Sequence, residues 1–132
     1  MQNVIKALAP LFKKDGHNIK AAYKADLIKF KVKANSHGVP ITVIEQLIPF
    51  YSQVAEVPCL DSLVIHGCDD ITIFEWWEDG ELWLGSRDYH ILRWSSQKSM
   101  FCVGDASNVS FGKKEEFKEF TDAVMYLVNV YS

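Results

Sequence analysis

The stretch CDDITIFEWWEDGELWLGSRDYHILRWS, residues 68–95, decides the fold of this chain. It is rich in β-branched and aromatic residues, which are typical of strands. Its Asp79-Gly80 pair is a favoured connection between antiparallel strands, because both positions accept a positive φ. We therefore predict that strands over residues 71–77 and 81–84 pair across this turn and that a strand over residues 89–94 continues the meander.

Strand signals continue on both sides of this stretch. The runs LDSLVIHG, residues 60–67, and SMFCVG, residues 99–104, are short, apolar and bounded by turn residues. Together these runs predict one twisted, largely antiparallel sheet.

Before the sheet, the apolar residues recur at helical spacing. Residues 18–37 have apolar side chains three and four positions apart and lysines between them, which predicts an amphipathic helix with a basic outer surface. Gly38 is suited to end this helix, and Pro40 suits the first turn of a second one over residues 40–54. Pro49 is expected to kink the second helix or to split it in two, because proline lacks the backbone donor.

The end of the chain, residues 110–132, returns to helical spacing. Glu115 and Glu116 are expected in the first helical turn, where carboxylates suit the helix dipole. One apolar stripe comprises Phe117, Phe120, Val124, Leu127, Val128 and Tyr131. Helices, then an antiparallel sheet, then a helix make an α+β fold, and 132 residues of which 48% are hydrophobic suit a single domain, residues 1–132.

No apolar run approaches the roughly 18 residues of a membrane-spanning helix, and no cleavage site follows the short apolar patch at the N-terminus. We therefore expect a cytoplasmic protein with no membrane partner. Cys59, Cys68 and Cys102 are widely spaced and form no CxxC pair, so we expect reduced cysteines and neither a disulfide framework nor a zinc knuckle.

Charge is unevenly distributed along the chain. Residues 1–40 carry eight lysines against two aspartates, a net of +6, whereas residues 41–110 carry three basic groups against eleven acidic ones, a net of −8. The basic part is interpreted as the solvated face of a helix, and the acidic part as a surface that favours basic partners.

Motifs for catalysis and cofactors are missing from the sequence. The four histidines are scattered without an HExxH pair, no GxSxG occurs, and the glycines build neither GxGxxG nor GxxxxGK[ST]. We therefore expect no enzyme activity, no cofactor, no metal and no direct contact with nucleic acid. The alternative, a small hydrolase, would need His66 or His90 to converge with Asp69, Asp70 or Cys68 in a pocket.

The tryptophans are the strongest candidates for binding. Trp76 and Trp77 are adjacent, so in a strand one points to the core and the other outward. A tryptophan within a rim of carboxylates has the composition of a binding hot spot, although cross-strand packing in the core would also explain these rings. The candidate binding residues are Asp69, Asp70, Glu75, Trp77, Glu78, Asp79, Glu81, Trp83 and Asp88.

Several of these segments together resemble the SUKH superfamily, which includes the yeast Smi/Knr-type cell-wall regulators and many small bacterial proteins. The resemblance is carried by IEQLIPFYSQV with Pro49, by LWLG ending at Gly85 and by Phe117 and Phe120 in the closing run. It covers residues 19–131. The chain departs from the family in YSQVAEVPCLDSL, where many members have a small-residue or glycine turn.

The resemblance implies an α+β fold, no catalysis and, in bacteria, an immunity protein that binds and neutralises a toxin domain, often a nuclease. An acidic face could cover the basic groove of such a nuclease. The alternative within the same family is an intracellular regulatory scaffold of Smi/Knr type. The expected partner is therefore a protein, with a basic toxin domain as the leading candidate.

Overall fold

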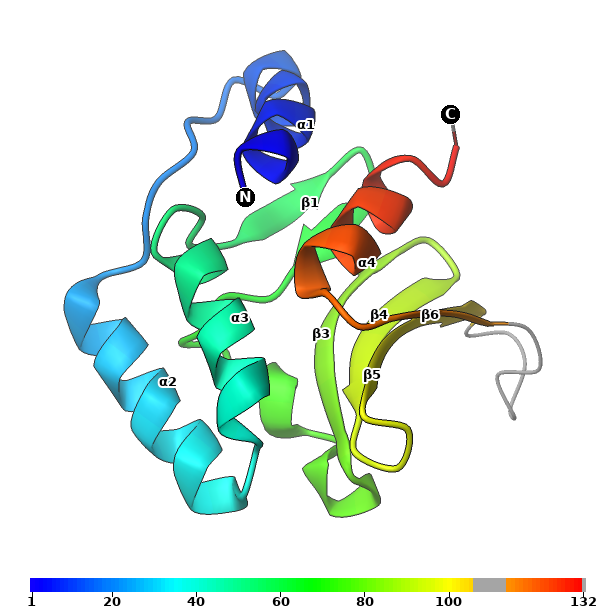
Figure 1. Cartoon of the computed structure of the whole chain (residues 1–132). Helices are drawn as coiled ribbons and strands as arrows, with labels where there is room; N and C mark the ends of the chain where they lie inside the picture. The colour runs from blue at the N-terminus through cyan, green and yellow to red at the C-terminus, as the bar shows by residue number, and fades with distance from the viewer. Residues whose placement is uncertain (106–113, 132) are drawn as a thin grey trace.

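The fold is built on one antiparallel sheet. The computed structural model describes residues 1–105 and 114–131. Within them each strand pairs with the next along the chain, in the order β1 to β6 (Figure 1). The strands are Val57–Leu60, Leu63–Ile65, Glu81–Arg87, His90–Ser95, Met100–Asp105 and Lys114–Phe117.

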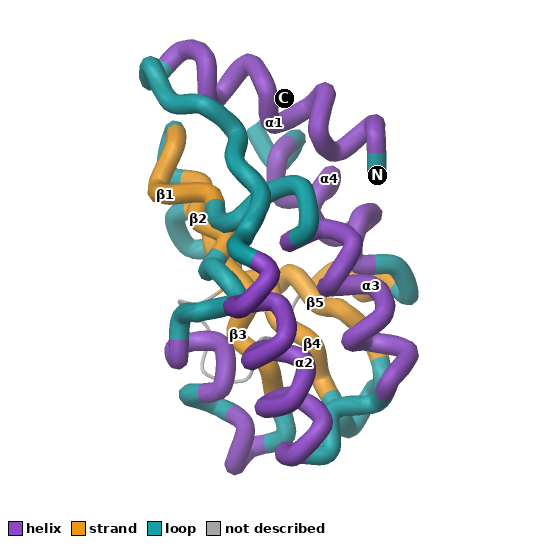
Figure 2. Tube along the Cα trace, turned by 90° about the vertical axis from the view of Figure 1, so that its left-hand side faces the viewer, coloured by secondary structure: helices purple, strands orange, loops and turns teal. Residues whose placement is uncertain are grey.

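Helices precede and follow the sheet. The α-helices are α1, Gln2–Lys14, α2, Lys24–His37, α3, Ile41–Tyr51, and α4, Phe120–Val128. Two short 3-10 helices, η1, Ile71–Phe74, and η2, Trp77–Asp79, lie between β2 and β3. Helices α2 and α3 lie side by side, and Figure 2 shows α3 and α4 on one side of the strands. The α+β fold predicted from the sequence is confirmed.

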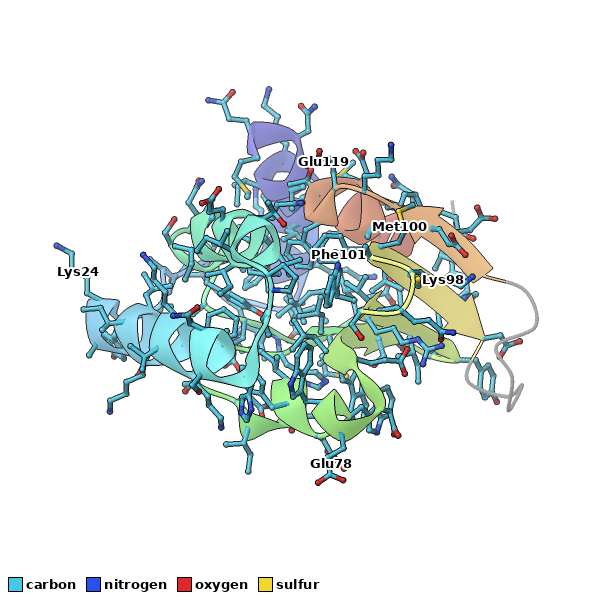
Figure 3. The ribbon with its side chains drawn as sticks, turned by 60° about the horizontal axis from the view of Figure 1, so that its bottom comes forward. Lys24, Glu78, Lys98, Met100, Phe101 and Glu119 are labelled. Atoms are coloured by element: carbon cyan, nitrogen blue, oxygen red, sulfur yellow. The ribbon has the colours of Figure 1, made fainter. Side chains whose placement is uncertain are left out.

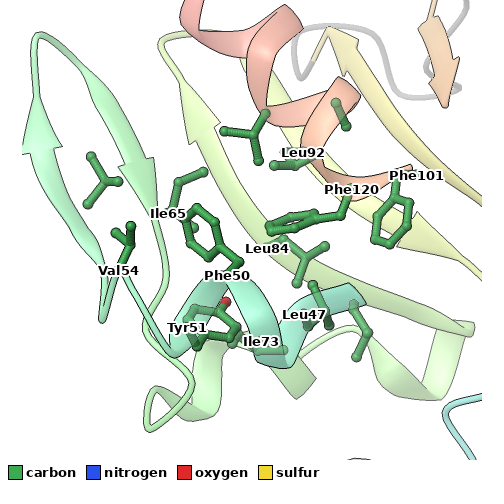
Figure 4. Packing of buried hydrophobic residues seen from close by; sticks show 14 of the residues in the cluster. Leu47, Phe50, Tyr51, Val54, Ile65, Ile73, Leu84, Leu92, Phe101 and Phe120 are labelled. Carbon is green, nitrogen blue, oxygen red and sulfur yellow. The ribbon is translucent and has the colours of Figure 1, made fainter. Parts of the chain in front are cut away.

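The core lies between the helices and one face of the sheet. Alternate residues of β3 to β5 face the helices because side chains alternate across a strand, and these residues are buried. The ring of Phe120 on α4 packs edge-on against Phe50 of α3, with centroids 5.2 Å apart, and lies 5.4 Å from Phe101 of β5 (Figure 4). Aromatic contacts of this kind join both helices to the sheet.

The predicted strand over residues 71–77 is wrong. This segment forms η1 and η2 instead, so no hairpin crosses Asp79-Gly80. A hydrogen bond caps η1: the backbone N–H of Thr72 donates to the side chain of Asp70 over 2.9 Å. Strand β3 pairs with β2 on one side and with β4 on the other, which confirms the predicted continuation of the meander.

The helices predicted before the sheet are present with different limits. Helix α2 begins at Lys24, and Gly38 ends it in the left-handed conformation, with φ of 87°. Helix α3 runs from residue 41 to 51 with Pro49 near its end, so the helix is not split. Helix α1 was not predicted from the sequence at all.

Two further segments differ from the predictions. Residues 60–67 hold parts of two strands, because Asp61 and Ser62 take positive φ values of 51° and 68° and turn the chain between β1 and β2. Glu115 and Glu116 lie on β6 and not in a helix. Helix α4 starts at Phe120, whose N–H donates to Oε1 of Gln46 on α3 over 2.7 Å.

The predicted apolar stripe is confirmed where it lies within α4. Phe120, Val124 and Leu127 are fully buried. Phe117 belongs to β6, and Tyr131 lies beyond the end of the helix with 56% of its surface exposed. Within residues 1–105 and 114–131, no helix has the length and apolar character needed to cross a membrane.

Candidate functional site

The face of the sheet turned away from the helices carries polar and aromatic side chains. Trp83 of β3 stands opposite Arg93 of β4, and Arg93 stands opposite Cys102 of β5. Trp83 alternates along β3 with Leu82 and Leu84, whose side chains face the core, so Trp83 and its cross-strand neighbours Arg93 and Cys102 lie on the outer face. On this face, Nη1 of Arg93 pairs with Oε1 of Glu81 at 2.6 Å.

Three aromatic rings meet on this face, and we call Trp76, Trp83 and His66 the tryptophan cluster. The indoles of Trp76 and Trp83 stack with centroids 4.2 Å apart and planes 1° from parallel. The imidazole of His66 meets Trp83 edge-on, with centroids 5.2 Å apart and planes at 86°. All three side chains are half-buried, so part of each remains open to solvent.

Three elements hold the tryptophan cluster in place. Trp83 sits within β3, and Trp76 lies between η1 and η2. His66 directly follows β2, where its N–H donates to the carbonyl of Leu84 over 2.9 Å and its carbonyl accepts from the hydroxyl of Tyr51 over 2.7 Å. Tyr51 is fully buried, so the core fixes the position of His66.

Two nitrogen atoms of the tryptophan cluster are buried without a hydrogen-bond partner within the described residues. They are Nε1 of Trp83, which can only donate, and Nε2 of His66. Leaving a buried polar atom unpaired costs about 1–3 kcal/mol, so such atoms call for a specific explanation. Both atoms are shielded from solvent, so neither is an exposed contact point of the patch.

Carboxylates border the tryptophan cluster. Oδ2 of Asp70 lies 3.7 Å from Nδ1 of His66. The pKa of Asp70 is lowered, mainly by the hydrogen bond from the backbone of Thr72. The pKa of His66 is also lowered, because burial disfavours its charged form more than Asp70 and Glu75 favour it. At neutral pH the tryptophan cluster is therefore an uncharged aromatic patch with acidic neighbours.

The structure brings together some of the predicted binding residues. Trp83 belongs to the tryptophan cluster, and Asp70 and Glu75 border it. Asp69, Glu78 and Asp79 are exposed on the same segment, and Figure 3 shows Glu78 projecting from η2 away from the rest of the chain.

Two predicted acids are placed differently. Glu81 pairs with the buried Arg93, so its charge is compensated. Asp88 lies beyond the opposite end of β3 and accepts a hydrogen bond from the hydroxyl of Tyr131 over 2.5 Å. Asp88 is therefore not part of this surface.

The two adjacent tryptophans take opposite sides, as predicted, but Trp77 is the one directed to the core. Its Nε1 donates to the carbonyl of His37 over 2.9 Å, and its ring packs 6.4 Å from that of the buried Trp94. Trp76, which the sequence analysis did not select for binding, stacks with Trp83 instead. The adjacency of the two residues predicted that their rings would point in opposite directions. Which ring faces the core is determined by the 3-10 helices on either side of them.

The arrangement offers little for nucleophilic catalysis. His66 and Asp70 do approach each other, and Cys68 lines a cleft together with Asp69 and Asp70, but His66 does not line that cleft. Burial, assisted by Asp69, raises the pKa of the Cys68 thiol to about 11, so the thiol is protonated at neutral pH. Over residues 1–105 and 114–131, no group of three or more His, Cys, Asp or Glu side chains could hold a metal ion.

Comparison with known proteins adds no family. The sequence matches no protein-family model, and no curated protein matches it. The function is therefore argued from the geometry of the tryptophan cluster and its acidic neighbours.

Proposed function

We propose that this chain is a non-catalytic protein-binding module that binds a basic protein domain through the tryptophan cluster. The observation that carries the proposal is the stacked pair of Trp76 and Trp83, half-exposed on the outer face of the sheet beside Asp70 and Glu75. Tryptophan is among the residues most enriched in binding hot spots, and a stacked pair is rigid before binding.

The polar groups around the pair suit a protein partner. Nε1 of Trp83 and Nε2 of His66 have no hydrogen-bond partner within the described residues but are buried, so a bound protein reaches them only if a neighbouring side chain moves. Glu75, Glu78 and Asp79 are exposed nearby and would attract a basic domain over a distance. Aromatic contacts at the centre of such a surface contribute most of the affinity. The surrounding carboxylates contribute specificity and increase the association rate.

We further propose that the partner is a toxin domain and that the chain acts as its immunity protein in bacterial cytoplasm. The resemblance to the SUKH superfamily, carried by Pro49, Gly85 and the closing phenylalanines, supports this proposal. The acidic segment supports it too, because carboxylates can occupy a groove that a nuclease uses for phosphates. The protonated thiol of Cys68 supports a role without nucleophilic catalysis.

The test is co-purification of the tagged chain from its native cells, with mass spectrometry of the proteins that remain bound through moderate salt. The wild-type chain is compared with the double reversal Glu75→Lys and Glu78→Lys, which leaves the Glu81–Arg93 pair intact. The control reverses Glu45 and Asp122, two exposed acids on α3 and α4, and so changes the net charge equally.

We expect the wild-type chain and the control to retain one basic protein, and the Glu75/Glu78 variant to lose it. The partner's affinity should also become less sensitive to salt in that variant, because fewer charges oppose each other across the interface. Equal retention by all three chains would contradict the proposed surface. Retention of a partner unrelated to any toxin would favour the regulatory scaffold.

A further inference from the structure

A second surface of the chain, distinct from the tryptophan cluster, lies between α2 and η1. A cleft of about 230 Å³ separates the two elements and has Phe30, Cys68 and Phe74 among its lining residues. Trp76, Trp83 and His66 do not line this cleft. Its two walls carry opposite charge.

The α2 wall is basic. Lys29 and Lys33 are four residues apart, so they share one side of the helix, and both line the cleft. Nζ of Lys33 lies 4.9 Å from the ring centre of Phe74. Half-buried Asp26 offsets part of this charge. Next to the lysines, Ile28 and Val32 form an apolar ridge on the outward side of α2, each with 64% of its surface exposed.

The opposite wall is acidic. It consists of Asp69 and Asp70 followed by Ile71, which exposes 74% of its surface. Within the described residues, no ion pair joins Lys29 or Lys33 to either aspartate. The cleft therefore separates a lysine wall with an apolar ridge from an aspartate wall with an exposed isoleucine.

We infer that this surface pairs with the same surface of a second copy of the chain about a two-fold axis. A two-fold axis through the cleft places the lysine wall of each copy against the aspartate wall of the other. The same rotation brings Ile71 of each copy onto the ridge of Ile28 and Val32 of its partner. The surface is thus complementary to itself in both charge and apolar character, and every contact is made twice.

The first test is sedimentation equilibrium of the purified chain over a range of concentrations. We expect the average mass to rise from 15.1 kDa towards twice that value and to stop there. Salt should weaken the dimer, because its charged contacts are exposed. A mass that stays at one chain, or that grows beyond two, would overturn the pairing.

A substitution tests the apolar contact. Ile71→Ser removes the exposed isoleucine without changing the charge, and Tyr89→Ser is the control, since Tyr89 exposes 71% of its surface and lies outside the cleft. Both side chains are largely solvent-exposed, so the fold should persist in both variants. The dimer should weaken in the first and persist in the second. Equal dimerisation of the two variants would contradict the inference.

Charge reversals test which wall of one copy faces which wall of the other. Lys29→Glu and Asp69→Lys should each weaken self-association about tenfold, since each reversal opposes like charges at both symmetric contacts. Mixed together, the two variants should recover a heterodimer, because the reversed wall of each then faces the opposite charge. Failure of the mixture to recover would overturn the two-fold pairing, even if each variant alone is a monomer.

These outcomes can be told apart from the proposed partner binding, although Asp70 both borders the tryptophan cluster and lines the cleft. Loss of the dimer with the partner still bound would count against the pairing alone. Loss of the partner in the Glu75/Glu78 variant would leave the pairing untouched, because neither residue lines the cleft.

Discussion

Trp76 and Trp83 stack face to face, with ring centroids 4.2 Å apart and planes 1° from parallel. Trp83 is fixed within β3, whereas Trp76 lies between two short 3-10 helices that pack against that strand. The contact therefore fastens the η1–η2 segment to the outer face of the sheet. It also presents a rigid aromatic patch beside Asp70 and Glu75, which is the basis of the proposed binding function.

The two adjacent tryptophans should differ in their effect on stability. Trp76→Ala removes a half-exposed stacking contact and should lower the free energy of unfolding by about 1 kcal/mol. Trp77→Ala removes a ring that packs on the core and donates a hydrogen bond to His37, and should cost about 3 kcal/mol. Urea denaturation of both variants checks the order. A larger loss for Trp76 would contradict the assignment of Trp77 to the core side.

His66 should make stability depend on pH. Its pKa is lowered in the folded chain by burial, so the unfolded chain binds a proton first as the pH falls. The free energy of unfolding should therefore fall as the pH drops from about 6.5 towards the lower pKa of the folded state, and His66 should add no slope above 6.5. Asp70, whose pKa is also lowered, acts in a separate and more acidic window.

Denaturation curves at several pH values measure this slope. His66→Gln should remove it, whereas His17→Gln, at an exposed histidine near the end of α1, should leave it unchanged. A slope that persists in the His66 variant would show that another group is responsible.

Arg87 should be the most sensitive charged residue of the sheet. Its guanidinium is almost fully buried and donates to the carbonyl of Val128 over 2.6 Å at the end of α4 and to Oδ2 of Asp61 over 2.8 Å. Arg87→Met should cost about 3 kcal/mol, because it leaves buried carbonyls unpaired.

A substitution of Asp61, the residue that pairs with Arg87, should have only a small effect on stability. Asp61→Asn should cost less than about 1 kcal/mol, because the side chain of Asp61 is 57% exposed and screened by water. Thermal or chemical denaturation of the two variants compares them directly. Similar losses would mean that the ion pair, and not the contact with α4, gives Arg87 its importance.

Gly85 and Gly16 should respond to alanine for different reasons. At Gly85 a β-carbon would clash with the backbone oxygen of Val64, so β2 and β3 would have to separate, at a cost above about 3 kcal/mol. At Gly16 nothing lies within 4 Å, and the cost of about 1 kcal/mol arises from its φ of 72°. Equal stability losses in denaturation would contradict the close approach of β2 to β3.

The sequence correctly predicted the elements whose residues favour a single type of secondary structure. Gly38 ends α2 because glycine, which has no β-carbon, adopts the left-handed conformation without strain, and the short apolar runs around Leu92 and Phe101 form β4 and β5. Residues 71–77 were misread because Ile71, Thr72 and Ile73 suit a strand, while the cap from Asp70 favours a 3-10 turn.

The candidate site could be predicted in part. The adjacency of Trp76 and Trp77 predicted that one ring would leave the core, but the choice depends on the turn geometry and on the hydrogen bond to His37. A two-residue hairpin at Asp79-Gly80 would also have placed Trp76 opposite Trp83, so the stack agrees with the predicted pairing although the segment before Gly80 is not a strand. The sequence named His66 only for the alternative hydrolase site; its contact with Trp83 was not predicted, because its position depends on the buried hydroxyl of Tyr51.

The most direct test of the central claim is partner recovery by a Trp76→Ala variant that has been shown to be folded. The tagged variant is compared with wild type and with Tyr89→Ala, an exposed aromatic outside the tryptophan cluster, by quantitative mass spectrometry of the co-purified protein. Loss of a hot spot of about 2 kcal/mol corresponds to about thirtyfold weaker binding. We predict that the partner disappears with Trp76→Ala and remains with Tyr89→Ala. Equal recovery by all three chains would contradict binding through the tryptophan cluster.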